Sequence, residues 1–264
     1  MIKRLPTLLP LAALLFGLGL PAHAAGDTVT VCDDSAEWPP FTYTPRSPAG
    51  DKTGAVTGYS VEVISDILHR ADIDFDIRLV PWARCLAEAR SGQMQIVLNA
   101  YVTPDRLQDY LISKPYLALT PHFFYDRRKF PDGLGGLTPA ELKRYAGCGM
   151  RGFVYDQYGI KPGELDQSSS SYDILLRKLM AGRCDYFPET IEAIAGFKVI
   201  GKDYLADARL AYTPLPGNAR LRAHFLVTRN HPRAYELLKA LDTGIDRLEQ
   251  SGQLKSLMKR YTGH

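Results

Sequence analysis

The segment Thr103-Pro-Asp-Arg106 places a hydroxyl and a guanidinium three positions apart. A guanidinium can bind a carboxylate through two parallel hydrogen bonds, and the threonine hydroxyl on the same loop can add a third. Backbone N–H groups near Asn99 to Tyr101 would complete such a site. The alternative is a surface arginine that pairs with Asp105 or Asp109. The chemistry that this segment offers is recognition of a carboxylate.

The two tryptophans of the chain, Trp38 and Trp82, each lie beside an expected strand end. Ligands bind at the carboxyl ends of strands in open α/β sheets. Flat aromatic faces exclude water and stack on planar or cationic groups. For each ring the alternative is ordinary packing under a loop. For Arg84 the two interpretations are a side chain that reaches the cleft and an exposed arginine at a helix start. The pattern indicates an aromatic wall beside the carboxylate site.

The first 24 residues have the pattern of a secretory signal. An apolar run at residues 5 to 24 follows two basic residues and closes on Ala22-His23-Ala24. Its core, Leu11 to Leu20, is shorter than the roughly 20 residues that span a bilayer. We therefore expect cleavage near Ala24 and a soluble mature protein in a bacterial periplasm.

Charge and residue spacing exclude several classes of function. Loss of the signal's two basic residues lowers the net charge from +3 to about +1, and no basic block indicates nucleic acid as a partner. The histidines are scattered singly, and the chain contains neither a C-x-x-C pair nor an H-E-x-x-H motif. We expect no metal, no cofactor and no hydrolase site.

Hydrophobic periodicity predicts alternating strands and helices. In the first half we expect strands at 28–31, 75–79 and 96–98 and helices at 61–71 and 84–90. Asp33-Asp34 should break the first strand, and Trp38-Pro-Pro-Phe41 should form a rigid loop. The second half should contain a short loop at 168–171, strands at 123–125, 147–152, 184–187, 198–200, 209–213 and 224–228, and helices near 139–145, 174–180, 234–248 and 254–260. This alternation predicts parallel sheets in two α/β lobes of about 120 residues.

In this order, the segments resemble the family 3 extracellular solute-binding proteins, the periplasmic receptors of polar amino-acid ABC transporters. The likeness covers nearly all of residues 28–262 and is carried by Trp38-Pro-Pro-Phe41, Gly58-Tyr-Ser-Val-Glu62, Thr103-Pro-Asp-Arg106, Pro115-Tyr116, Gly182-Arg-Cys-Asp185 and Ser251-Gly-Gln-Leu254. It implies a two-lobed, type II-like periplasmic-binding-protein fold, with two α/β lobes joined by two hinge strands. Lobe 1 would comprise residues 25–118 and 225–264, and lobe 2 residues 119–224, after a signal peptide at 1–24.

The resemblance also implies a ligand site in the cleft between the lobes. Arg106 would bind the ligand carboxylate with help from Thr103 and the region of Asn99, beside Trp38 and Trp82. From lobe 2, Gly152-Phe153 occupies the place of the family's Gly-Thr-Thr turn, and Glu189 stands near the family's ammonium-binding aspartate. The alternative for Glu189 is a solvated glutamate at a helix start.

The chain departs from the family pattern at positions that affect ligand choice. Phe153 and Val154 replace two hydroxyl side chains, and Ser60 stands where an aspartate is common. A ligand without an α-ammonium group, or a larger and more aromatic one, would suit these substitutions as well as an amino acid.

Four cysteines lie in the exported part of the chain, where an oxidising compartment favours disulfides. In the implied fold, Cys32 ends the first strand and Cys85 opens the helix after the second, and these elements are expected to lie side by side. Cys148 and Cys184 would end neighbouring strands of lobe 2. We predict the bridges Cys32–Cys85 and Cys148–Cys184, each within one lobe.

The resemblance implies a monomeric binding protein and not an enzyme. It would capture a small polar ligand, an amino acid or a related carboxylate, by hinge closure and present it to the membrane permease of an ABC transporter. Two alternatives remain open. One is a cyclohexadienyl-dehydratase-like enzyme on the same fold, with Glu189 or Glu192 as the acid, and the other is a binding module that reports the ligand to a sensory partner.

Overall fold

The structure of the chain is a computed structural model that describes residues 1–2, 28–134, 138–217 and 220–262. The predicted signal peptide and its cleavage point near Ala24 lie outside the described residues. Among the helices that the structure describes, none has the length and apolar character needed to cross a membrane.

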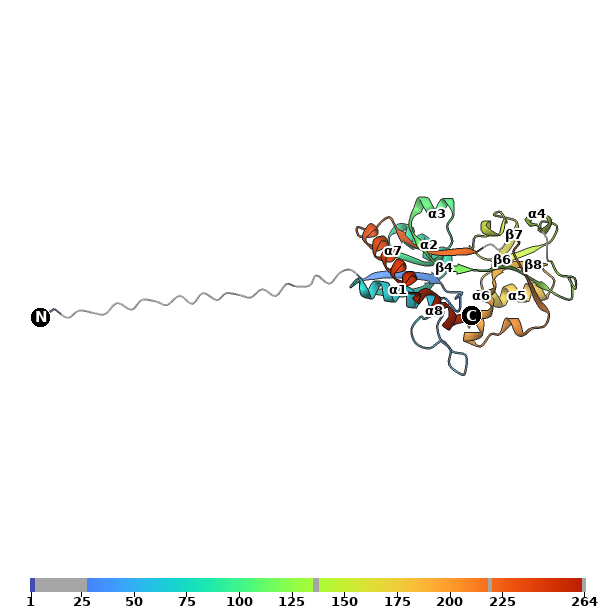
Figure 1. Ribbon diagram of the computed structural model, residues 1–264, viewed down its shortest axis with the longest axis horizontal. Coiled ribbons are helices and arrows are strands. Elements are labelled where there is room, and N and C mark those ends of the chain that lie inside the picture. Colours follow the sequence, from blue (N-terminus) through green and yellow to red (C-terminus); the bar gives the residue numbers. More distant parts are fainter. Residues whose placement is uncertain (3–27, 135–137, 218–219, 263–264) are drawn as a thin grey trace.

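A five-stranded sheet forms the framework of the first lobe, on the left of Figure 1. Its strand order is β2-β1-β3-β10-β4, where the strands are Val29–Asp34 (β1), Phe75–Val80 (β2), Ile96–Ala100 (β3), Tyr110–Leu119 (β4) and Leu221–Thr228 (β10). β1 is parallel to β2 and β3, whereas β10 is antiparallel to β3 and β4. The helices of lobe 1 are Tyr59–Arg70 (α1), Trp82–Ser91 (α2), Pro104–Asp109 (α3), Ala234–Gln250 (α7) and Gln253–Thr262 (α8).

A second five-stranded sheet forms lobe 2, with the order β7-β6-β8-β5-β9. Its strands are Pro121–Asp126 (β5), Gly147–Met150 (β6), Leu165–Ser169 (β7), Tyr186–Thr190 (β8) and Leu210–Pro214 (β9). β6 is parallel to β7 and β8, and β5 is antiparallel to β8 and β9. Lobe 2 also contains the helices Pro139–Leu142 (α4), Tyr172–Met180 (α5) and Ile191–Gly196 (α6). The prediction of two α/β lobes is confirmed, but the expectation of parallel sheets is wrong, because each sheet also contains antiparallel strands that run through the crossings.

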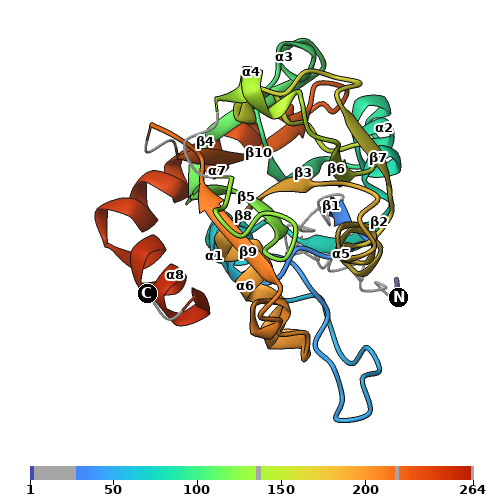
Figure 2. The same cartoon turned by 90° about the vertical axis from the view of Figure 1, so that its right-hand side faces the viewer.

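Helical periodicity explains how α1 and α7 cover the sheet of lobe 1. Ile64 and Ile67 on α1 and Leu241 and Ile245 on α7 are buried at intervals of three or four residues, which places them on one face of each helix. Gly244 lets the two helices approach closely, because a Cβ at this position would lie 2.5 Å from Cγ1 of Ile67. Residues 43–57 form a loop that extends away from the body of the molecule (Figure 2).

The two lobes are joined where β4 continues into β5 and where β9 leads to β10. At the first crossing, Glu192 at the start of α6 accepts hydrogen bonds from the backbone N–H of Thr120 at 3.0 Å and from its hydroxyl at 2.8 Å. Arg220, close to the second crossing, also donates to the Thr120 hydroxyl. Glu192 and Arg220 therefore tie both crossings to α6.

Residues far from the crossings also bring the lobes together. Gly196 at the end of α6 lies against the Pro39-Pro40 segment of lobe 1, where a Cβ on the glycine would be 2.2 Å from Cδ of Pro40 and 2.4 Å from the carbonyl oxygen of Pro39. α8 of lobe 1 contacts the same helix, as the neighbouring labels in Figure 1 indicate. The described arrangement is therefore one in which the lobes are in contact.

Several sequence expectations for local structure are wrong. Asp33 and Asp34 do not break the first strand but are its last two residues, paired with Leu79 and Val80 of β2. Residues 198–200 belong to a 3-10 helix, Phe197–Ile200, and the expected loop at 168–171 overlaps the end of β7. β4 and β7 were not predicted. Their sequences lack a clean two-residue alternation, and β4 includes Pro115, where its pairing with β10 shifts register.

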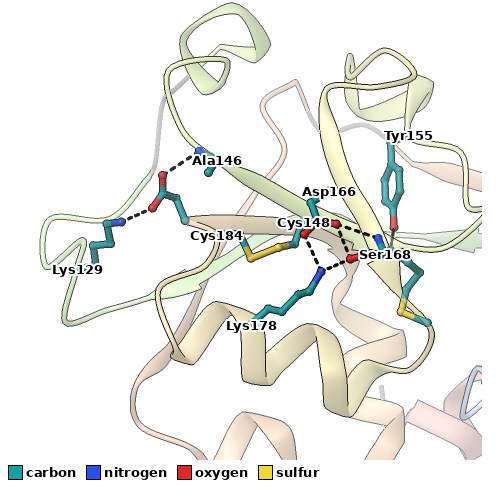
Figure 3. The surroundings of a disulfide bond; sticks show 10 residues. Lys129, Ala146, Cys148, Tyr155, Asp166, Ser168, Lys178 and Cys184 are labelled. Atoms are coloured by element: carbon teal, nitrogen blue, oxygen red, sulfur yellow. Dashed lines mark hydrogen bonds and ion pairs between the residues drawn. A yellow bond between two sulfur atoms is a disulfide. The ribbon is translucent and has the colours of Figure 1, made fainter.

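Both predicted disulfides are present. Cys32 on β1 bonds Cys85 on α2, and Cys148 on β6 bonds Cys184, which precedes β8; in each pair the Cα atoms are 5.8 Å apart. Figure 3 shows the second bridge beside Lys178, which donates to Asp166 and to Ser168 on β7. Each bridge links two elements of a single lobe, so neither spans the crossings.

Replacing both Cys148 and Cys184 with alanine is expected to lower the free energy of unfolding by about 2 to 4 kcal/mol, because the bridge restricts the unfolded chain. Urea denaturation followed by circular dichroism measures the change. Reduction of the wild-type protein removes both bridges and should lower stability further. A double variant that unfolds at the wild-type urea concentration would contradict this expectation.

Candidate functional site

A small cavity of about 40 Å³ lies between the lobes, at the carboxyl ends of strands from both sheets. Lobe 1 contributes two carboxyl groups, an amide, a guanidinium and three aromatic rings: Asp33, Asp34, Asn99, Arg106, Trp38, Trp82 and Tyr101. Lobe 2 contributes one carboxyl group and four largely apolar side chains: Glu189, Phe153, Val154, Tyr155 and Tyr158. Six of the eight residues predicted from the sequence to contact a ligand line this cavity.

Arg106 is a buried cation that lacks an anionic partner among the described residues. Its side chain is 6% exposed, and its guanidinium carbon lies 5.4 Å from the ring centre of Trp82. Nη1 donates to the carbonyl oxygen of Tyr101 at 2.6 Å, which fixes the direction of the side chain. Burial lowers the pKa of Arg106 to about 10, so it stays charged at neutral pH. A buried positive charge held in this way is a ready site for an anion.

The alternative in which Arg106 pairs with a neighbouring aspartate is wrong. Asp109 instead bonds Arg90 at 2.5 Å, and Arg106 is the buried residue of its short helix. Arg84, the other candidate cation, is exposed and pairs with Glu88 at 2.6 Å on α2. Arg106 is therefore the guanidinium that faces the cavity.

Thr103 supports Arg106 and does not line the cavity. Its hydroxyl accepts the backbone N–H of Arg106 at 3.3 Å, so it caps the start of α3. This cap, together with Pro104 in the first turn, determines where the helix begins and thereby where Arg106 projects. In the structure Thr103 thus has a positioning role, and the predicted contact of its hydroxyl with a ligand stays a prediction.

The side chain of Asn99 is fully engaged within lobe 1. Its Nδ2 donates to Asp33 at 2.6 Å and to the Thr42 hydroxyl at 2.7 Å, while its Oδ1 accepts from the hydroxyls of Ser60 and Tyr116. The backbone N–H of Asn99 donates to the Tyr116 hydroxyl at 3.1 Å. The N–H of Asn99 is therefore engaged within lobe 1, and the expected ligand contact of backbone N–H groups in the region 99–101 stays a prediction. Asn99 organises the floor of the cavity, and Ser60 takes part in the same network.

The sequence analysis missed two carboxyl groups, Asp33 and Asp34, at the end of β1. Asp33 accepts bonds from Asn99 and from the backbone N–H of Asp34, and burial raises its pKa to about 7. Burial also raises the pKa of Asp34, whose Oδ1 accepts the backbone N–H of Ala36 at 3.1 Å. The signal that could have found them is an acidic pair at the carboxyl end of a predicted strand.

Glu189 lies in the wall of lobe 2 and is 5% exposed, which excludes the alternative of a solvated glutamate at a helix start. Its Oε2 accepts the hydroxyl of Tyr172 at 2.6 Å, and its Oε1 accepts the backbone N–H of Thr190 at 2.7 Å. Burial raises the pKa of Glu189 to about 7, in spite of these bonds.

The turn at Gly152 in lobe 2 contacts Trp82 of lobe 1. Gly152 has a positive φ of 78°, and a Cβ on it would lie 3.4 Å from Cδ1 of Trp82. The next residue, Phe153, lines the cavity with its ring centre 6.3 Å from that of Trp82. Gly152 thus borders the cavity, and Phe153 gives this wall an aromatic surface, at a position where the family pattern has a hydroxyl side chain.

Three tyrosines in the cavity wall were also missed: Tyr101, Tyr155 and Tyr158. The hydroxyl of Tyr155 accepts the backbone N–H of Met150 at 2.8 Å. The hydroxyls of Tyr101 and Tyr158 and the indole N–H groups of Trp38 and Trp82 are buried without a hydrogen-bond partner among the described residues. Because the chain has 15 tyrosines, no local pattern distinguishes these three.

No group of three or more His, Cys, Asp or Glu side chains in the described ranges is arranged to hold a metal ion. The titratable groups that line the cavity are three carboxyl groups, the phenols of three tyrosines and one guanidinium.

Comparison with known proteins places this geometry in a family context. The model of the bacterial extracellular solute-binding proteins, family 3, matches residues 30–264. The probable amino-acid-binding protein YxeM of Bacillus subtilis (strain 168) is 28% identical over 116 residues, which is 42% of this chain and 41% of that protein.

Two solved structures share the fold of nearly the whole chain. The arginine-, lysine-, histidine-binding protein ArtJ of Geobacillus stearothermophilus is similar with a TM-score of 0.69 and 17% identity, over 90% of this chain and 96% of ArtJ. A histidine kinase sensor domain with similarity to periplasmic binding proteins gives a TM-score of 0.71 and 21% identity, again over 90% and 96% of the two chains.

The raised pKa of Glu189 predicts a pH-dependent stability. Between pH 4.5 and about 7 the unfolded chain ionises this carboxyl while the folded protein keeps it protonated, so its contribution to stability falls as the pH rises. At 1.36 kcal/mol for each pH unit, the fall amounts to about 3 kcal/mol. Glu189→Gln should flatten the decline in unfolding free energy measured by urea denaturation from pH 4.5 to 8.

The matched control is Glu236→Gln, which replaces an exposed glutamate on α7. The ion pair with Arg233 lowers the pKa of Glu236, so this carboxyl is already ionised across the measured pH range and the variant should show the wild-type decline in stability. An equal decline in stability for wild type and Glu189→Gln would show that Glu189 titrates normally.

Proposed function

We propose that this chain, which belongs to the family 3 bacterial extracellular solute-binding proteins, binds a small carboxylate-bearing ligand between its lobes for uptake by an ABC transporter. The ligand class is an amino acid or a related acid. The observation that carries the proposal is the buried guanidinium of Arg106, which faces the cavity without a carboxylate partner among the described residues. The proposed location is the periplasm, after signal cleavage near Ala24, and the proposed state is a monomer.

The cycle that we propose needs no covalent step. With the lobes apart, Arg106 and the tryptophans of lobe 1 are accessible to solvent and bind the ligand carboxylate first. Rotation about the two crossings then brings Phe153, Tyr158 and Glu189 over the ligand and excludes water, which strengthens the ion pair with Arg106. The closed surface formed by both lobes is what the membrane permease would recognise.

Arg106→Ala is expected to weaken ligand binding by about 2 to 5 kcal/mol, because the ligand carboxylate would be buried without a partner. A thermal-shift screen of amino acids, polyamines and small organic acids first identifies a binder, since a ligand stabilises the folded state by mass action. Calorimetry with that binder then measures the loss of affinity.

Arg84→Ala is the matched control, because it removes an exposed arginine that pairs with Glu88 outside the cavity. Its affinity should equal that of wild type. Unaltered binding by Arg106→Ala would reject Arg106 as the anchor of the ligand.

Gly196→Ala is expected to hold the lobes apart, because its Cβ would overlap Pro40 and the carbonyl oxygen of Pro39. In small-angle scattering the radius of gyration of the ligand-saturated variant should exceed that of the wild type, and affinity should fall by about tenfold or more. Gly244→Ala, which crowds Ile67 within lobe 1, should lower stability without changing the radius of gyration. Identical scattering from Gly196→Ala and wild type would contradict this account of closure.

Catalysis on the same fold is a second candidate, favoured by Glu189, because a cavity carboxyl with a pKa of about 7 is suited to general acid work. Glu192 is not suited to that role, since it is engaged with Thr120 at the crossing and does not line the cavity. Incubation of the purified protein with prephenate or arogenate, followed by chromatography, distinguishes the two. Turnover that is lost in Glu189→Gln would establish an enzyme.

A further inference from the structure

We infer that the ligand is a carboxylate whose remaining polar atoms are hydrogen-bond acceptors, such as a 2-oxo acid, in preference to an amino acid with a free ammonium group. The inference rests on the proposed function, because it takes the interlobe cavity as the ligand site. It concerns the groups around Arg106 that would contact the rest of the ligand.

Every polar group of the cavity wall that lacks a partner among the described residues can donate a hydrogen bond. Among the described residues, five buried side-chain polar atoms have no hydrogen-bond partner, and four of them belong to residues that line this cavity. Two are the indole N–H groups of Trp38 and Trp82, which can only donate, and two are the hydroxyls of Tyr101 and Tyr158. Arg106 adds guanidinium N–H groups beyond the single bond to Tyr101. A ligand rich in acceptors satisfies all of these groups.

The carboxyl groups of the wall, by contrast, already accept hydrogen bonds within the protein. Asp34 accepts from the backbone N–H of Ala36 at 3.1 Å, and backbone groups of Trp82 and Ser35 also bond its carboxyl group. Both oxygens of Glu189 accept bonds, one from Tyr172 and the other from Thr190. Asp33 likewise accepts at both oxygens, from the backbone N–H of Asp34 and from Asn99. An ammonium has three N–H donors and no acceptor, so it cannot pair with the indole N–H groups of Trp38 and Trp82, and the carboxyl oxygens that it needs already accept bonds within the protein.

Charge and surface character support the same class of ligand. Burial raises the pKa of Asp33 and of Glu189 to about 7 and also raises the pKa of Asp34, so these carboxyl groups carry less negative charge near neutral pH than exposed ones and attract an ammonium less strongly. The remaining wall is mostly aromatic, with Phe153 and Tyr155 from lobe 2 facing the tryptophans of lobe 1. Such surfaces suit a flat, unsaturated group next to a carboxylate.

The test compares acids that share a carbon skeleton and differ only at the α position. Calorimetry on the purified chain with both disulfides formed would use pyruvate and alanine, 2-oxoglutarate and glutamate, and phenylpyruvate and phenylalanine. In the pair that binds most tightly, the oxo acid should bind at least about tenfold more tightly than the amino acid, because it leaves fewer donors unpaired. The inference is overturned if the amino acid binds as tightly or more tightly, or if no oxo acid binds.

Tyr158→Phe and Tyr101→Phe identify the source of the preference. Each removes one free donor and should lower oxo-acid affinity by about threefold to tenfold while changing amino-acid affinity little. Tyr212→Phe, at an exposed tyrosine on β9, is the matched control and should change neither. Equal affinities for the oxo acid in wild type and both cavity variants would also overturn the inference.

Failure of this inference and failure of the proposed function give different results. If amino acids bind more tightly than oxo acids and Arg106→Ala abolishes that binding, the ligand class is wrong and the proposed carboxylate site stands. If the ligand binds equally well to Arg106→Ala, the proposed site itself is wrong.

Discussion

The organisation of this protein depends on one uncompensated charge. Arg106 holds a guanidinium that is 6% exposed, oriented by the Tyr101 carbonyl and stacked near Trp82, with no carboxylate of the described chain as its counterion. Burying a charge without a partner is costly, and an ion pair with good geometry offsets that cost. In the proposed cycle, complete closure of the lobes is therefore most favourable when an anion occupies the cavity, and this would link ligand binding to the closed conformation.

The covalent links of the chain are compatible with the proposed movement of the two lobes. Each disulfide links elements within one lobe, and each lobe has its own five-stranded sheet, so neither bridge would oppose rotation at the crossings. α6 has contacts at both of its ends that depend on the angle between the lobes, because Glu192 binds Thr120 at the crossing and Gly196 packs on Pro39-Pro40. Family membership fits this arrangement, since the model of the family extends over residues 30–264.

The sequence predicted the lobes, both disulfides and the position of Arg106, because the order and spacing of short motifs indicate the order of strands and helices in the fold. It did not predict which residues line the cavity when these residues come from segments far apart in the chain. Asp33 and Asp34 looked like strand breakers, yet hydrogen bonds from Asn99 and Ala36 allow them to end β1 in a buried position. Tyr101 and Tyr158 lie in segments without periodicity, and only the approach of the two lobes brings them to one cavity. Thr103 illustrates a residue whose local role was not predicted, because its hydroxyl caps α3 and thereby positions Arg106.

The central claim is that the lobes close around a carboxylate bound by Arg106. A crystal structure of the protein with its tightest-binding acid tests this most directly. The account predicts both carboxylate oxygens about 2.7 to 2.9 Å from guanidinium nitrogens of Arg106, with Trp82 and Phe153 on either side of the ligand. A ligand bound outside the interlobe cavity, or one whose carboxylate contacts other groups while Arg106 keeps only the Tyr101 carbonyl, would contradict it.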